Sequence, residues 1–77
     1  MSASQQKQPR YWSGDVPAQC QLSQRSITDT FIDGATSYGP WAIMHPQAHD
    51  MYGRGLGMGK GQQYEKQPDG RWMKTAG

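Results

Sequence analysis

The sequence contains only one cysteine, Cys20, and no long hydrophobic run. A single thiol rules out an internal disulfide framework, so we expect a reduced, intracellular protein. No apolar stretch approaches the ~20 residues of a membrane-spanning helix, and the N-terminus has no hydrophobic signal region. We therefore expect a soluble protein in the cytoplasm that does not interact with a membrane.

Charge and apolar content are also low. Eight basic and six acidic residues leave a formal net charge of +2, which neither demands nor excludes nucleic acid as a partner. Hydrophobic residues make up only 34% of the 77 residues. A chain of this size buries a modest fraction of its surface, so it commonly needs a metal or a partner to be stable.

Polarity divides the chain into two parts. Residues 1–10 have almost no apolar side chains, and we expect a disordered tail there because such a segment cannot repay the entropy lost on ordering. Residues 11–77 are expected to form a single small domain. Tyr11 and Trp12 stand at the start of this domain, where they either dock onto it as a lid or contact a partner.

A first hairpin and a short helix are predicted in the middle of the chain. Residues 27–44 have the highest apolar content of the chain, and their residue types alternate in the manner typical of a β-hairpin. Asp33-Gly34 supplies a turn signal. Pro46 can begin a helix, because its missing N–H does no harm in the first turn. We expect this helix to run to Tyr52 and to be closed by Gly53.

A glycine-rich loop and a second hairpin are predicted to follow. Glycine at every second position from 53 to 61 disfavours a regular helix or a paired strand. Residues 63–66 then face residues 71–74 across a turn at 68–70, and Tyr64 and Trp72 are expected to form a cross-strand aromatic pair. The predicted fold class is a small α+β domain with two β-hairpins, one short helix and a glycine-rich loop.

Cys20, His45 and His49 are the candidate metal ligands. A structural zinc site takes four N or S ligands, and two short ligand segments separated by a hairpin bring four ligands together. The fourth ligand would have to come from one of several weaker candidates: Ser23, Asp29, Asp50 or water. Because the sequence offers no strong fourth ligand to complete the tetrahedral site, we expect a degenerate or absent metal site rather than bound zinc. We also expect no other cofactor.

The glycine-rich run resembles a phosphate cradle, but it fails the pattern of a nucleotide-binding loop. Arg54 occupies the first required glycine, and Gly61 replaces the Ser or Thr that would hold magnesium. A structural crossover is the preferred interpretation. The chain also offers no nucleophile held by a base and an orienting third group, so we expect neither an enzyme nor a small-molecule substrate.

Five basic or aromatic residues are candidates for contact with a protein or with nucleic acid. Such side chains dominate protein interfaces and also contact phosphates and stack on bases. They are Trp12, Arg54, Lys60, Arg71 and Trp72. For the last hairpin, a half-buried ribbon with its charged side outward is the simpler interpretation.

From Cys20 to the C-terminus, the sequence resembles small uncharacterised phage and prophage proteins. The resemblance lies in residues 31–34, 39–44, 52–64 and 69–72. These relatives carry Cys-x-x-Cys before the first hairpin and Cys-Pro-x-Cys-His after it, which implies a zinc-ribbon-like fold. Cys20 matches the first ligand, His45 the third, and His49 the histidine that follows. Ser23 and Ala48 depart from the second and fourth ligands, which argues against bound zinc but not against the fold.

The resemblance carries no activity, so three functions stay open. The preferred one is a small phage-type accessory protein that binds another protein. The expected partners are proteins of the host, whose cytoplasm it would share. Partly exposed aromatic residues and arginine are typical of interface hot spots. The first alternative is a nucleic-acid-binding, zinc-ribbon-like protein. The second is a component of the virion or of its assembly.

Overall fold

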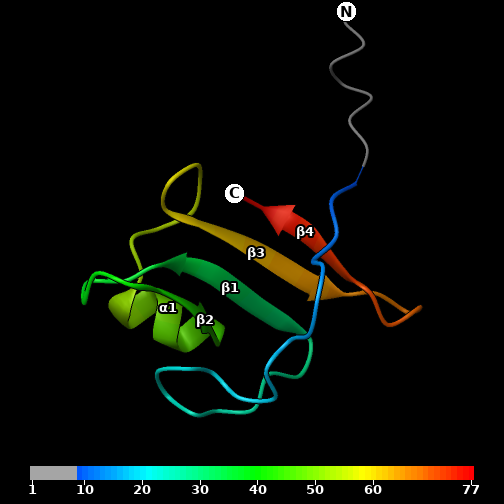
Figure 1. Ribbon diagram of the computed structural model, residues 1–77, viewed down its shortest axis with the longest axis horizontal. Helices are drawn as coiled ribbons and strands as arrows, with labels where there is room; N and C mark the ends of the chain where they lie inside the picture. The colour runs from blue at the N-terminus through cyan, green and yellow to red at the C-terminus, as the bar shows by residue number, and fades with distance from the viewer. Residues whose placement is uncertain (1–8) are drawn as a thin grey trace, which may run out of the picture.

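The computed structural model describes residues 9–77, which hold a four-stranded antiparallel sheet and one short helix. The strand order across the sheet is β2-β1-β3-β4 (Figure 1). The elements are β1 Thr30–Ala35, β2 Trp41–Met44, α1 Pro46–Tyr52, β3 Gly61–Lys66 and β4 Trp72–Ala76. The predicted α+β class with β-hairpins and one short helix is confirmed, whereas the likeness to a zinc ribbon stays a prediction.

The turn predicted at Asp33-Gly34 is wrong, because both residues lie inside β1. Gly34 pairs with Gly61 of β3. A Cβ built on Gly34 would lie 2.9 Å from the carbonyl oxygen of Lys60, so the glycine permits a close approach of two strands. The chain instead reverses after Thr36, where the N–H of Gly39 donates to the Thr36 carbonyl at 3.0 Å.

The helix α1 has the predicted bounds, and both of its ends are set by neighbouring residues. Pro46 occupies the first turn, and the His45 side chain caps the N-terminus by accepting a hydrogen bond from the N–H of Gln47. Gly53 ends the helix without left-handed backbone, since its φ is −80°. A Cβ on Gly53 would instead collide with the imidazole of His49, which explains the glycine at this position.

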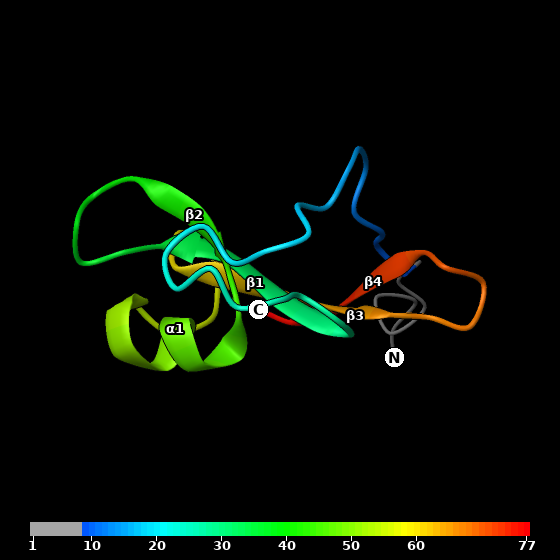
Figure 2. The same ribbon diagram turned by 90° about the horizontal axis from the view of Figure 1, so that it is seen from below.

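The two faces of the sheet have different covers (Figure 2). The helix α1 packs against one face beside β1 and β2, where Ala48 meets Ala42 and Met44. Alternation along β1 directs Phe31 to the other face, which the N-terminal segment crosses. The free edge of β2 is covered as well: the N–H of Gln21 donates to the Ile43 carbonyl, and its side chain accepts from the Ile43 N–H.

The N-terminal segment runs along β4 as an additional edge. The N–H of Trp12 donates to the Trp72 carbonyl at 2.8 Å, and the N–H of Lys74 donates to the Arg10 carbonyl at 2.7 Å. Arg10, assigned to the tail from the sequence, therefore pairs with the sheet. Residues 1–8 of the predicted tail lie outside the described residues.

The second hairpin forms where it was predicted, but its register differs. Lys66 pairs with Trp72, and Tyr64 pairs with Lys74, so Tyr64 and Trp72 are diagonal neighbours and not partners. Phe31 of β1 contacts both rings, with centroid distances of 5.2 Å to Tyr64 and 5.1 Å to Trp72. Within residues 9–77, no helix is long and apolar enough to cross a membrane.

Candidate functional site

The first candidate site is the turn that begins at Cys20. The Cys20 thiol is 1% exposed, and its sulfur accepts hydrogen bonds from the N–H groups of Leu22 at 3.4 Å and Ser23 at 3.3 Å. Burial raises the pKa of this thiol, but hydrogen bonds from Ser23, the His45 backbone and Leu22 outweigh the burial and leave the pKa below its ordinary value. The sulfur therefore lies in a closed turn whose hydrogen bonds lower the pKa of the thiol.

The structure brings Cys20 close to His45 but does not gather the three predicted ligands. The Nδ1 atom of His45 is engaged in capping α1, 3.2 Å from the N–H of Gln47. The Nε2 atom of His49 lies 3.0 Å from the carbonyl oxygen of Gly55, in the connection that leads to β3. Across residues 9–77, no group of three or more His, Cys, Asp and Glu side chains could hold a metal ion.

The five predicted contact residues do not share one surface. Trp12 and Trp72 belong to the aromatic cluster around Phe31. Arg71 lies at the β3–β4 turn, where its Nε is 2.9 Å from a carboxylate oxygen of Asp69 and its guanidinium stands over the ring of Tyr11 at 4.0 Å. The remaining two, Arg54 and Lys60, are exposed in the connection between α1 and β3, at the other end of the sheet.

Basic and aromatic side chains alternate on the face of β3 and β4 that carries the aromatic cluster. Two cross-strand pairs there each combine a lysine with an aromatic ring: Tyr64 with Lys74, and Lys66 with Trp72. The Lys66 ammonium lies 5.9 Å from the centre of the Trp72 ring. Tyr64 is half-buried, and burial together with the nearby Asp33 carboxylate raises the pKa of its hydroxyl, although Arg10 acts in the opposite direction.

A second candidate site is the end of the sheet where three connections meet. Ala35 pairs with Trp41, Gly34 with Gly61, and Thr36 bridges to Gly53, so the β1–β2 turn, the end of α1 and the start of β3 lie together. Five large apolar side chains are exposed here: Tyr38 by 65%, Trp41 by 46%, Met51 by 71%, Leu56 by 40% and Met58 by 95%. We call this set the apolar end.

The apolar end was missed in the sequence because its members come from three separate segments. The signal that was available is Met58, an apolar residue flanked by glycines that have no side chains to bury it. The pairing of β1 with both β2 and β3 brings the three segments to the same end of the sheet. No protein-family model matches the sequence, and no curated protein or solved structure matches the chain.

Proposed function

We propose that this chain is a small phage-type accessory protein that binds another protein, and that the apolar end is its contact surface. The observation that carries the proposal is the exposure of five large apolar side chains at one end of a 77-residue chain. Surfaces of this kind on small soluble proteins mark interaction sites, because leaving apolar area in contact with water costs free energy.

The charges near the apolar end indicate the chemistry of the partner. Residues 36–61 include two cations, Arg54 and Lys60, both exposed, and a single carboxylate, Asp50. A partner surface with an apolar centre and acidic residues around it would complement this arrangement. Met51 and Met58 suit such a contact, since unbranched thioether side chains adapt to the shape of the opposite surface.

We expect the double variant Met51→Asp, Met58→Asp to lose its partner. Two buried carboxylates at the contact should weaken binding at least ten-fold, because each would have to give up its hydration. The measurement is affinity capture from host lysate with immobilised protein, followed by titration of the purified partner. The variant should fold normally, as both side chains are exposed.

The matched control is Thr28→Asp, which adds a carboxylate at an exposed position before β1, at the opposite end of the sheet. The control should capture the same partner as the wild type. If no captured protein depends on the two methionines, the proposal is wrong. It also fails if sedimentation shows that the methionines serve only to join two copies of this chain.

Binding of single-stranded nucleic acid is a second candidate, favoured by the two lysine–aromatic pairs of β3 and β4. Aromatic rings stack on bases while nearby cations contact phosphates. For the double variant Lys66→Gln, Lys74→Gln, we expect the slope of log K against log salt to become shallower by about 1.4, which is two phosphate contacts on a single strand. Fluorescence anisotropy with a labelled oligonucleotide measures this slope, and an absence of binding at low salt would exclude the candidate.

A further inference from the structure

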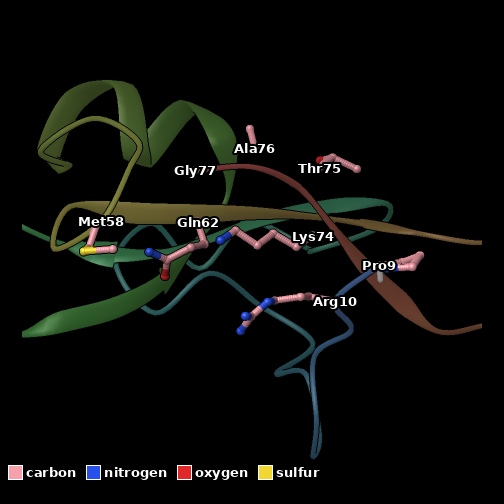
Figure 3. A pocket seen from close by; sticks show the side chains of 8 residues that line it. All are labelled: Pro9, Arg10, Met58, Gln62, Lys74, Thr75, Ala76 and Gly77. Carbon is pink, nitrogen blue, oxygen red and sulfur yellow. The ribbon is translucent and has the colours of Figure 1, made fainter. Parts of the chain in front are cut away.

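The sheet has two outer edges, and the edge at β4 is already occupied by the N-terminal segment. The N–H of Trp12 donates to the Trp72 carbonyl, and further along the N–H of Lys74 donates to the Arg10 carbonyl. The side chains of Arg10 and Lys74 line the hollow between these two segments (Figure 3). Another strand could therefore pair with β4 at these positions only by displacing the N-terminal segment.

The outer edge of β2 is covered at only one of its two outward-facing residues. Gln21 satisfies both backbone groups of Ile43: its N–H donates to the Ile43 carbonyl at 3.0 Å, and its side-chain oxygen accepts from the Ile43 N–H at 2.8 Å. Backbone groups alternate in direction along a strand, so those of Trp41 point to the same outer side as those of Ile43. The pairing agrees, because Ala35, which is opposite Trp41 in β1, donates its N–H to the Lys60 carbonyl instead.

Trp41 therefore presents a backbone N–H and C=O that point away from the sheet. Within residues 9–77, neither group has a hydrogen-bond partner. Trp41 is 46% exposed, so this position of the edge is open to solvent. An open edge position of this kind is a template for an extended segment of another chain, which can form two backbone hydrogen bonds with it.

We infer that the partner contributes an extended segment, which pairs with Trp41 and adds a strand to the edge of β2. The inference rests on the proposed function, since Trp41 belongs to the apolar end, and it specifies the kind of segment that the partner presents. Gln21 shows the required chemistry at the next position of the same edge, where one N–H and one amide oxygen satisfy Ile43. Because Gln21 occupies Ile43, the added segment extends from Trp41 toward the β1–β2 turn.

The register indicates which side chain of the added segment matters and why a second copy of this chain does not fit. Ala42 packs against Ala48 of α1, so Trp41 and Ile43 point to the opposite face of the sheet. The residue that pairs with Trp41 places its side chain on that face, beside the indole, and a β-branched or aromatic residue is expected there. Antiparallel pairing of two β2 strands over more than one residue would require Ile43, whose backbone groups Gln21 already holds.

The probe is a synthetic peptide, the tightest binder selected on the immobilised full chain from a displayed library of random linear peptides. Hydrogen exchange of the ¹⁵N-labelled chain is followed by NMR. Without peptide, the Trp41 amide should exchange much faster than that of Ala42, which pairs with Gly34 of β1. Saturating peptide should slow exchange at Trp41 about ten-fold or more. Methylating the peptide nitrogens one at a time should weaken binding about ten-fold at the residue that donates to the Trp41 carbonyl, because one hydrogen bond is lost.

Two variants separate this inference from the proposed function, and the amide spectrum of each verifies its fold. Thr28→Asp, at the opposite end of the sheet, should bind the peptide like the wild type. If Met51→Asp, Met58→Asp loses the peptide while Trp41 stays unprotected in the wild type, the apolar end is a contact surface that adds no strand, and the inference is overturned. If Trp41 is protected and the methionine variant binds normally, the added strand is supported and the contact proposed for the methionines fails. A library that yields no binding peptide also overturns the inference.

Discussion

Replacing Phe31 with alanine is expected to destabilise the protein by about 3–5 kcal/mol. Phe31 is 0% exposed, and its ring contacts three others, those of Trp12, Tyr64 and Trp72. Alanine would remove the ring that all three of these aromatic side chains contact, and it would leave a cavity between β1, β3 and the N-terminal segment. A chain of 77 residues has roughly 4–12 kcal/mol of total stability, so the variant should lose a large share of it and unfold at a markedly lower urea concentration than the wild type.

Urea unfolding followed by tryptophan fluorescence measures this loss, because two of the three rings around Phe31 are tryptophans. The control is Tyr38→Ala, which removes an aromatic ring that is 65% exposed and should change the unfolding free energy by less than about 1 kcal/mol. A Phe31→Leu variant should lie between the two. Equal stability of Phe31→Ala and Tyr38→Ala would show that the aromatic cluster does not hold the sheet together.

Replacing Cys20 with alanine is expected to cost about 2–3 kcal/mol, the second largest effect. The substitution removes a buried atom from the cluster of Ala42, Met44 and Ala48, and it takes away the acceptor of the N–H groups of Leu22 and Ser23. Serine keeps an acceptor at nearly the same place, so Cys20→Ser should cost less than the alanine variant. Urea unfolding of both variants measures the difference.

The same two variants distinguish packing from metal binding. The side chains of His45 and His49 are engaged with Gln47 and Gly55, so we expect a chelator to leave the urea midpoint of the wild type unchanged. A drop caused by the chelator in the wild type, absent from Cys20→Ser, would instead show a bound metal. Native mass spectrometry of protein purified without chelator reports the same property directly.

The lowered pKa of Cys20 predicts how stability changes with pH. A thiol whose pKa is lower in the folded than in the unfolded state adds stability above its unfolded pKa, and this contribution is lost as the pH falls through the folded pKa. The advantage of the wild type over Cys20→Ser should therefore grow as the pH rises into the range where thiols titrate. No change in that advantage would mean that the hydrogen bonds to the sulfur do not favour the thiolate.

Local sequence determined the helix and the second turn of this protein. Pro46 and Gly53 bound α1 as expected, because a proline in the first helical turn and a glycine after the last turn act through their own backbone and near neighbours. The turn after Gln67 follows the same logic, with Gly70 at a φ of +90°. Both features depend on residues within a few positions of one another.

Features that depend on pairing between distant segments follow from the fold and not from the local sequence. Asp33-Gly34 has the composition of a turn, yet it lies in β1, because Gly34 meets Gly61 across the sheet. Tyr64 and Trp72 are separated by the register of the hairpin and joined through Phe31, a residue from another strand. The predicted ligands Cys20, His45 and His49 have side chains that can bind a metal. In the folded protein, each of these side chains instead forms a hydrogen bond with a nearby backbone group.

The candidate sites follow the same division. The amino-acid types alone establish which residues carry a thiol, a positive charge or an aromatic ring, and local signals set the bounds of the short elements on which these residues lie. Strand pairing decided that Arg54 and Lys60 are remote from Arg71, that the β1–β2 turn and the start of β3 lie at the same end of the sheet, and that Arg10 stands beside Lys74. The physical reason is that local dihedral preferences act over a few residues, whereas a surface is built from segments that meet only when the sheet forms.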